Sequence, residues 1–420
     1  NYDAPSLTAI EPRNGSTAGA FTMTVFGKNF GTASADALVS FIPLSRSGQG
    51  NSGLSVVRIA DSSVAFVVPA NVGTDSTISV TVKSQTGSSQ ANVNFTFCYD
   101  IPKVNSYLPT AGSRPTSGGF VMTLTGTNFG TAATSHLVTV GVGNVICTSV
   151  LVVVDHTSLT CVAPSGTGVG AGIVVTVAGL MGVHTATFAY SSPIVATVRL
   201  PASNPTLGGA TITLEGANFG AVKTKLNITV GSTACPHDTR QGLFVGHTSV
   251  SCVIAAGVGK QLDVSIAVDS LAGTLASSYF YDPPTVTSVS PGTGPTSGGF
   301  AVIIRGTNFG APALSSSRTA EIGGFDCASI LWTDSSVTCN VGANTGTSKP
   351  VFIKIQADGN ANRDQSVTAV SMFSYTAASV INGVSLRNHP GSGMRPSLET
   401  SPPITPTSNE PHTFAACARP

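Results

Sequence analysis

Six of the eight cysteines form three closely spaced pairs, so sulfur is the first group here that could do chemistry. The pairs are Cys147 with Cys161, Cys235 with Cys252, and Cys327 with Cys339. Each second cysteine follows a similar phrase, which is His-Thr-Ser twice and Asp-Ser-Ser once. Zinc-ligand pairs usually lie about two to four residues apart, which disfavours zinc. Equivalent pairs in tandem predict three intradomain disulfide bonds, formed in an oxidising compartment.

The two remaining cysteines are Cys98 and Cys417. Because the total is even, a bond between them is attractive, either within one chain or between neighbouring chains. Two free thiols are the alternative.

A short run of side-chain oxygens resembles a calcium-binding loop. It consists of Asp358, Asn360, Asn362 and Asp364. Such loops need a turn glycine at the sixth position and an acid at the twelfth, where this chain has Arg363 and Ala369. The pattern therefore favours a polar hairpin loop, with a calcium site as the weaker alternative and no other metal or cofactor.

The histidines and acids do not form a catalytic pattern. The seven histidines are scattered at 136, 156, 184, 237, 247, 389 and 412. His156 and His247 occupy the place that Asp61 and Asp334 hold in the other repeats, which is typical of turn capping. The 19 acids are spread thinly, without the pairing that general acid–base catalysis needs. We predict a protein that is not an enzyme.

The composition is poor in charge, with 9% Asp, Glu, Lys and Arg and a net charge of +1. Nucleic-acid binding is disfavoured because it needs a basic surface. Solubility must come from attached sugar or from burial in an assembly, and three sequons begin at Asn14, Asn94 and Asn227. No stretch approaches the roughly 18 apolar residues of a membrane span. A start at Asn1 without a signal peptide suggests a processed secreted protein or a fragment.

One motif recurs four times and organises the whole chain. Its copies are Gly27–Gly31, Gly126–Gly130, Gly216–Gly220 and Gly306–Gly310, each with the pattern Gly-x-Asn-Phe-Gly. Each copy follows an apolar run typical of a β-strand, so we expect a strand that ends in a tight turn. Glycine and asparagine tolerate positive φ, and the phenylalanine should fill the core beneath the turn. Phosphate binding is disfavoured, because strand-like sequence rather than a helix follows each copy.

The repeats predict an all-β chain of four tandem β-sandwiches in a semi-rigid rod, with an extended C-terminal tail. Repeats 1 to 4 cover residues 1–100, 101–191, 192–282 and 283–376, and the tail covers 377–420. Proline at the junctions should stiffen them. Repeat 1 has Phe66 in place of the second cysteine, so we expect an apolar plug there. Trp332 is expected in a core.

The order of these features resembles the IPT/TIG family. The shared pattern is Pro-x-x-Gly-Gly, a strand, Gly-x-Asn-Phe-Gly, a cysteine pair and a closing aromatic strand, over roughly residues 5 to 376. The resemblance implies immunoglobulin-like domains of the kind found in plexins, scatter-factor receptors, fibrocystin-like surface proteins and Rel-type transcription factors. It is specific for the fold and not for function, since the family spans adhesion, signalling and DNA binding.

The tail begins like a fifth repeat that does not continue. Its apolar residues are Val380, Ile381, Val384 and Leu386. Such an orphan strand could complete a sheet edge in its own chain or in a neighbour, and a disordered terminus is the alternative. We predict a non-catalytic, extracellular or cell-surface structural protein that assembles with itself into a glycosylated fibre. An adhesion or receptor ectodomain and a carbohydrate-binding region of an enzyme are the alternatives.

Overall fold

The computed structural model describes most of the four repeats and none of the tail. The described residues are 3–32, 37–42, 51–54, 56–74, 76–83, 85–88, 96–109, 114–184, 188–222, 225–237, 244–312 and 317–376. The predicted assembly residues Val380, Ile381, Val384 and Leu386, together with Cys417 and the sequon residue Asn94, lie outside them.

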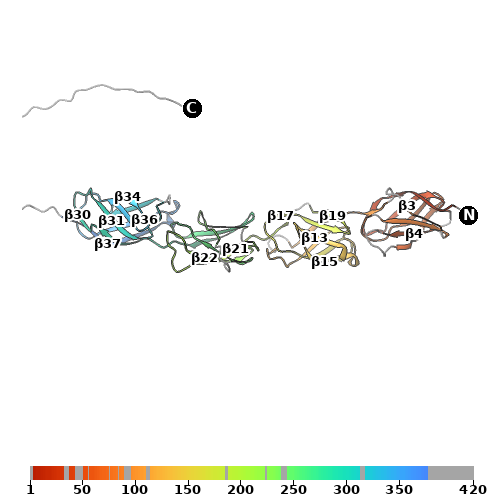
Figure 1. Cartoon of the computed structure of the whole chain (residues 1–420), viewed down its shortest axis with the longest axis horizontal. Helices are drawn as coiled ribbons and strands as arrows, with labels where there is room; N and C mark the ends of the chain where they lie inside the picture. Colours follow the sequence, from red (N-terminus) through yellow and green to blue (C-terminus); the bar gives the residue numbers. More distant parts are fainter. Residues whose placement is uncertain are drawn as a thin grey trace, which may run out of the picture. The chain divides into compact units, whose positions relative to one another are not determined.

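Each repeat is a sandwich of two β-sheets, as Figure 1 shows with the first repeat in red and the fourth in blue. In repeat 1 the sheets have the orders β1 (Ser6–Glu11), β3 (Thr22–Lys28), β7 (Ser63–Val67), β6 (Val56–Ala60) and β5 (Asn51–Leu54), β4 (Ala37–Ile42), β8 (Thr77–Val82), β9 (Gln85–Ser88). In repeat 2 they are β11 (Lys103–Leu108), β12 (Val121–Thr127), β16 (Ser158–Val162), β15 (Thr148–Val154) and β14 (Val145–Ile146), β13 (Val138–Val142), β18 (Ile173–Val177), β19 (Leu180–Val183).

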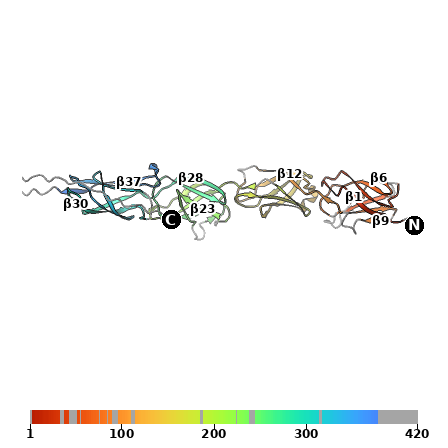
Figure 2. The same cartoon turned by 90° about the horizontal axis from the view of Figure 1, so that it is seen from above.

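The last two repeats keep this order, and β23 and β28 can be followed in Figure 2. Repeat 3 contains β21 (Ile194–Arg199), β22 (Thr211–Ala217), β26 (Ser249–Val253), β25 (Phe244–Val245) and β24 (Thr233–Ala234), β23 (Leu226–Val230), β27 (Leu262–Val268), β28 (Leu271–Tyr279). Repeat 4 contains β29 (Thr285–Ser290), β31 (Ala301–Thr307), β35 (Ser336–Asn340), β34 (Ala328–Trp332) and β30 (Thr293–Pro295), β37 (Gln365–Thr376), β36 (Lys349–Ile355), β32 (Arg318–Ile322), β33 (Phe325–Asp326).

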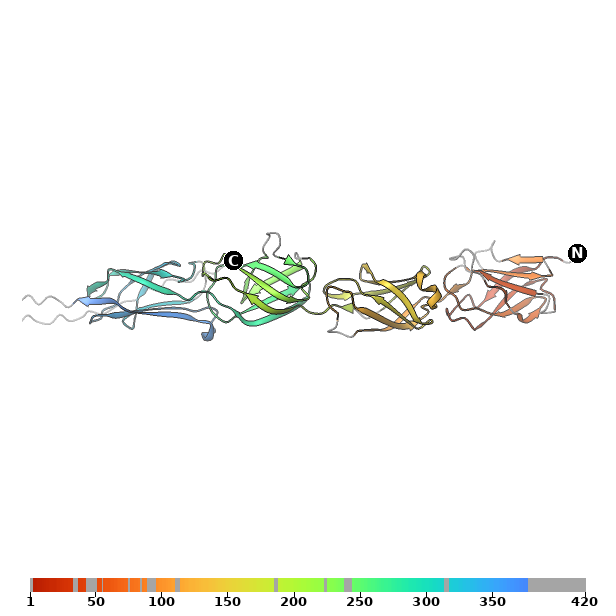
Figure 3. The same ribbon diagram turned by 90° about the horizontal axis from the view of Figure 1, so that it is seen from below.

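A few short elements complete the repeats. Strands β2 (Asn14–Gly15) and β10 (Cys98–Tyr99) pair in parallel, and β17 (Val169–Ala171) pairs with β20 (Phe188–Ala189). Within the described residues, the helical elements are two 3-10 turns, η4 (Ala132–Leu137) and η6 (Ala361–Arg363). The predicted all-β class with four sandwiches is confirmed, and the two layers of each sandwich are visible in Figure 3.

Alternating side chains build the cores. In β27 every second residue from Leu262 to Val268 is buried, as expected when one strand face meets the core and the other meets solvent. Each repeat has its own buried apolar cluster. Each sandwich therefore buries most of its own apolar surface.

The recurring motif has the structure that the sequence predicts. Its four asparagines adopt positive φ between 60° and 66°. Its four phenylalanines, Phe30, Phe129, Phe219 and Phe309, are completely buried. The phenylalanine fills the core beneath the turn, while the asparagine stays at the end of the sandwich where the chain enters the repeat.

A buried tyrosine closes each repeat beside a glycine turn. In repeat 2 the Tyr190 hydroxyl donates to the carbonyl of Pro164 at 2.9 Å. The same carbonyl would lie 2.5 Å from a methyl group added to Gly118, whose φ is +68°. Only glycine allows this approach. The equivalent tyrosines Tyr99, Tyr281 and Tyr375 make the same bond in their repeats.

Candidate functional site

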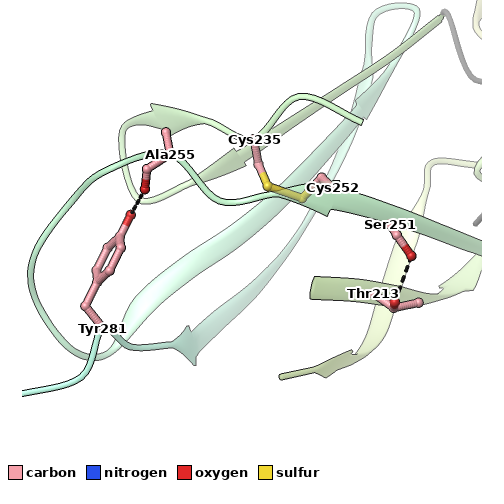
Figure 4. The surroundings of a disulfide bond; sticks show 6 residues. All are labelled: Thr213, Cys235, Ser251, Cys252, Ala255 and Tyr281. Atoms are coloured by element: carbon pink, nitrogen blue, oxygen red, sulfur yellow. Dashed lines mark hydrogen bonds between the residues drawn. A yellow bond between two sulfur atoms is a disulfide. The ribbon is translucent and has the colours of Figure 1, made fainter. Parts of the chain in front are cut away.

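Two of the three predicted cysteine pairs are disulfide bonds in the structure. The sulfur atoms of Cys235 and Cys252 are bonded, and so are those of Cys327 and Cys339. Figure 4 shows the disulfide bond between Cys235 and Cys252. In the same repeat, the Tyr281 hydroxyl donates a hydrogen bond to the Ala255 carbonyl. In both pairs the second cysteine lies on the strand that pairs with the strand leading into the motif.

Cys147 and Cys161 differ from the prediction, because they are two adjacent buried thiols rather than a disulfide. Their backbone positions match the other pairs: the Cys147 amide donates to Val140, as the Cys235 amide does to Ile228. The difference is confined to the sulfurs, which share a hydrogen bond in place of a covalent bond. That bond lowers the pKa of the Cys147 thiol and raises that of Cys161.

The remaining predictions for the cysteines and for two core aromatic residues can also be compared with the structure. Cys98 on β10 is a half-buried thiol, and its proposed partner Cys417 lies outside the described residues. Phe66 takes the place of the second cysteine in repeat 1 and is completely buried opposite Met23, as predicted. Trp332 packs at the edge of the repeat 4 core and donates its indole N–H to the Phe309 carbonyl.

In the calcium-like loop, groups of the protein itself contact several of the oxygens, whereas the buried Asp364 Oδ1 has no hydrogen-bond partner among the described residues. Asp358 Oδ1 accepts the Asn360 amide, and its Oδ2 lies 2.6 Å from Nη1 of Arg363. Asp364 pairs with Lys354 at 3.0 Å. Among the described residues no group of three or more His, Cys, Asp or Glu side chains is placed to hold a metal ion. The loop acts as a capped turn in which arginine stands where a cation would.

Two sequon asparagines lie among the described residues, and both are exposed. The Asn14 amide donates to the Asp100 carboxylate at 2.8 Å, so it is already engaged. Asn227 projects from β23.

The two histidines singled out by position bond to the preceding repeat. His156 Nδ1 lies 2.9 Å from the Thr17 hydroxyl of repeat 1. His247 Nδ1 lies 2.9 Å from the Thr116 hydroxyl of repeat 2. Turn capping, predicted for this position, is therefore performed by Asp61 but not by the two histidines: Asp61 accepts the Gly31 amide within its own repeat. We call these contacts between consecutive repeats joint 1–2 and joint 2–3.

The motif asparagine completes each of these joints. Asn128 Oδ1 accepts the Thr17 amide and the Ser16 hydroxyl, and its Nδ2 donates to the Ile101 carbonyl at 3.2 Å. Asn218 Oδ1 likewise accepts the Thr116 amide at 3.2 Å. One side chain thus ties the linker and the neighbouring repeat to the turn. With its backbone at positive φ, the asparagine side chain reaches both the linker and the neighbouring repeat. The motif therefore takes part in the joint as well as in the fold of its own repeat.

Joint 3–4 uses a carboxylate in place of the imidazole. The Thr206 hydroxyl of repeat 3 donates to Asp334 Oδ1, which also accepts the Gly310 amide at 3.0 Å. Thr17, Thr116 and Thr206 all come from the turn with two glycines or its equivalent, and each is at most 1% exposed. The same threonine position therefore supplies the donor in all three joints.

Further polar contacts are found at joint 3–4. The Gln365 side chain accepts the Gly259 amide at 3.1 Å and donates to the Tyr281 carbonyl at 2.6 Å. Arg363 bridges Asp358 of repeat 4 and Asp263 of repeat 3, at 2.6 Å and 3.0 Å. These contacts add charge and a buried amide to the threonine–aspartate bond.

An apolar side chain from the preceding repeat seals two joints. Val72 of repeat 1 is completely buried in the core cluster of repeat 2, close to Gly130. Val258 of repeat 3 joins the cluster of repeat 4. Thr167 holds the same place in joint 2–3, where its hydroxyl donates to Asp269 at 2.5 Å. Because these residues enter the next repeat, each joint is a packed interface rather than a free hinge.

Burial in joint 1–2 changes the acid–base behaviour of His156. Loss of solvent lowers its pKa, against the opposing effect of the neighbouring Asp155 carboxylate. The neutral imidazole is therefore the favoured form in the closed joint. A signal for the joints was present in the sequence, since a threonine recurs two or three residues before the glycine turn, but its partner lies more than 100 residues further on.

Comparison with known families decides what these repeats are. The model of the IPT/TIG domain matches residues 5–97, 102–190, 193–281 and 284–375, which is most of the chain. The chain belongs to the IPT/TIG domain family. The joints described above therefore link four consecutive IPT/TIG domains, each with the same motif at its entry.

Individual relatives of this IPT/TIG chain are distant. Fibrocystin-L from Homo sapiens is 26% identical over 360 residues, covering 85% of this chain and 8% of that protein. The extracellular region of plexin A4 is 16% identical, covering 89% of this chain and 38% of that one, with a TM-score of 0.20. The surface glycan-binding protein PbSGBP-B from Prevotella bryantii is 17% identical, covering 44% and 43%, with a TM-score of 0.28.

The disulfide bonds bear on the compartment of this IPT/TIG chain. Disulfide bonds persist in oxidising surroundings, and two are present. Among the described residues, no helix has the length and apolar character needed to cross a bilayer. The disulfide bonds indicate an extracellular or secreted protein.

Proposed function

We propose that this chain is a non-catalytic, extracellular array of IPT/TIG domains that serves as a stiff spacer in a surface protein of the adhesion or receptor type. The observation that carries the proposal is the joint, which recurs three times with the same threonine donor and motif position. Freely hinged domains need no such contacts, whereas a spacer must resist bending at every junction.

The chemistry of the surface supports an extracellular setting. Disulfide bonds, exposed sequon asparagines and few charges are consistent with a secreted chain that carries attached sugar. Asn227 is the better candidate for a glycan, because Asn14 already donates its amide to Asp100. Treatment of the secreted chain with an N-glycosidase, followed by mass spectrometry, would identify the modified asparagines.

Electron microscopy of single chains tests the spacer proposal. The distribution of angles between neighbouring domains should be narrow in the native chain. It should broaden at joint 1–2 alone in a Val72→Asp variant, since an unpaired carboxylate would enter the apolar cluster of repeat 2 that Val72 joins. Equal, broad distributions in both proteins would refute the proposal.

Self-assembly into an extracellular fibre is a second candidate. It is favoured by the 9% content of charged residues, which leaves sheet edges and faces with little charge to prevent association. Native material, kept unreduced, should then show regular filaments by electron microscopy. Deletion of residues 377–420 should abolish them if the tail links the subunits, and filaments of normal appearance after deletion would exclude that role of the tail.

A further inference from the structure

We propose that joint 3–4 contains a binding site for a neutral sugar ring, in a cavity that repeats 3 and 4 form together. The cavity has a volume of about 370 Å³. Its walls come from both repeats and from the linker between them, and they include Lys260, Phe280, Pro283, Asp364 and Ser366. We call it the joint cavity. Such a site goes beyond the role of a spacer and does not depend on it.

The size and the floor of the joint cavity suit a small ligand. Ligand pockets typically measure about 300–1,000 Å³ and often lie where two domains meet, so this cavity is at the small end of that range. Gln365 and Tyr281 lie beneath it, and both are at most 7% exposed. The Gln365 side chain accepts the Gly259 amide and donates to the Tyr281 carbonyl. The floor is therefore fixed by its own bonds, and the walls are left to contact a ligand.

One wall of the joint cavity is an aromatic ring that faces solvent. Phe280 is 45% exposed, whereas Tyr279 and Tyr281 on either side of it are at most 2% exposed. The face of an aromatic ring carries partial negative charge, and it attracts the weakly positive C–H groups on one face of a sugar ring. Phe280 thus offers the flat apolar surface on which a sugar ring can stack.

The opposite wall contains a carboxylate that lacks a hydrogen-bond donor. The Asp364 side chain is only 8% exposed, and its Oδ2 pairs with Lys354 at 3.0 Å. Its Oδ1 is buried and accepts no hydrogen bond from any described residue. A buried acceptor without a donor costs free energy, which a ligand hydroxyl would recover. The carboxylate can turn toward such a hydroxyl because the terminal torsion of aspartate is soft.

The charges around the joint cavity favour a neutral ligand. A cation would compete with Lys354 for Asp364 and would also meet the ammonium group of Lys260. An anion would lie against the Asp364 oxygen, which needs a donor. A hydroxyl group can donate to Asp364 and accept from Lys260 or Ser366. A ring that carries several hydroxyls and has an apolar face therefore matches both walls.

The wall that repeat 4 supplies is a feature of that repeat. In repeats 2 and 3 the connection between the corresponding strands is short, with residues 178–179 between β18 and β19 and residues 269–270 between β27 and β28. In repeat 4, residues 356–364 connect β36 and β37, and Asp364 is the last of them. The longer connection brings Asp364 to the joint, whereas the shared fold does not require it.

The wall from repeat 3 also differs from its equivalent in joint 2–3. The glycine whose carbonyl accepts the amide of the closing tyrosine is followed by Lys260 in repeat 3 and by Val169 in repeat 2. The residue before that tyrosine is Phe280 in repeat 3 and Ala189 in repeat 2. The aromatic ring, the ammonium group and the carboxylate therefore come together at joint 3–4 through substitutions specific to this pair of repeats.

A ligand in the joint cavity would contact both repeats and should hold the joint closed. Binding to the closed joint alone stabilises it by a factor of one plus the ratio of ligand concentration to Kd. At ten times Kd, exchange of the Gly259 amide, which bonds across the joint to Gln365, should slow about ten-fold. Joint 1–2 contains no part of this cavity, so exchange of the Thr17 amide should not change.

Saturation-transfer NMR on the full chain tests the site. The probes are the methyl glycosides of glucose, galactose, mannose and N-acetylglucosamine, each at millimolar concentration. At least one should bind with a Kd on the order of millimolar, as expected for a small ligand in an open cavity. Phe280→Ala and Asp364→Asn should each weaken that binding about five-fold. Phe325→Ala removes an exposed aromatic ring of repeat 4 outside the cavity and should have no effect.

Three outcomes would overturn the proposal. One is that none of the four glycosides binds, and another is that the native chain and the Phe280→Ala variant bind them equally. The third is that calcium chloride binds in place of the glycosides and Asp364→Asn abolishes its binding, since the oxygen would then belong to a metal site. Each variant must unfold thermally like the native chain. If Asp364→Asn does not, Phe280→Ala decides the result, because that side chain lies at the surface.

Discussion

Joints 1–2 and 2–3 close with an imidazole, whereas joint 3–4 closes with a carboxylate at the same position. His156 and His247 take positive φ and donate their own amides to the motif glycines Gly130 and Gly220. Asp334 reverses this direction, since its side chain accepts the Gly310 amide. The threonine donor and the buried phenylalanine are common to all three. The three joints therefore share one frame, in which a single position carries either an imidazole or a carboxylate.

The first test compares joints that have a buried valine from the preceding repeat with the same position where the side chain is exposed. We expect the largest change in joint stability here. Val72→Ala and Val258→Ala each remove buried methyl groups and should weaken joints 1–2 and 3–4 by about 2 kcal/mol. Amide hydrogen exchange reports this directly, through the Thr17 amide for joint 1–2 and the Gly259 amide for joint 3–4. Thr345→Ala, at the same position in repeat 4, is exposed and should change neither amide.

The second test uses acid to separate the two kinds of joint. Burial lowers the pKa of His156 below the ordinary 6.5, so the open joint binds a proton more readily than the closed one. The stability of joint 1–2 is therefore complete above about pH 6.5 and is lost as the pH falls through the lowered value. Protection of the Thr17 amide should fall in that range.

A matched variant sharpens the acid test. His156→Asp installs the acceptor of joint 3–4 in joint 1–2 and should remove the loss of Thr17 protection that sets in as the pH falls below about 6.5. If the native protein and the variant lose protection equally over this range, the imidazole does not control the joint.

The third test removes one hydrogen bond. Thr116→Val deletes the hydroxyl that pairs with His247 and should weaken joint 2–3 by about 1 kcal/mol, measured as faster exchange of the residue 116 amide. Thr296→Val makes the same change where no described residue accepts the hydroxyl, and it should leave all three internal joints unaltered. Equal effects of both changes would mean that the threonine acts through its own turn instead.

The smallest effect concerns the ion pairs of joint 3–4. Arg363→Met removes the pairs with Asp358 and Asp263, both of which are partly exposed and screened by salt. We expect slightly faster exchange of the Gly259 amide at low ionic strength and no difference at high ionic strength. A loss that persists in high salt would show that Arg363 contributes packing rather than charge.

The sequence alone determined most of what is local to one repeat. Strand alternation, the four buried phenylalanines and the positive φ of the motif asparagines follow from patterns a few residues long. The pairs Cys235–Cys252 and Cys327–Cys339 follow from their recurrence on equivalent strands. These features were predictable because short-range sterics and burial decide them before the repeats meet.

Only the tertiary structure decided what lies between repeats and between sulfurs. Cys147 and Cys161 recur at positions equivalent to those of the bonded pairs, yet the structure places them as two buried thiols. His156 and His247 looked like turn residues, and their true partners are threonines more than 100 positions earlier. No periodic pattern records such a contact, because it exists only once two separately folded sandwiches have been packed against each other.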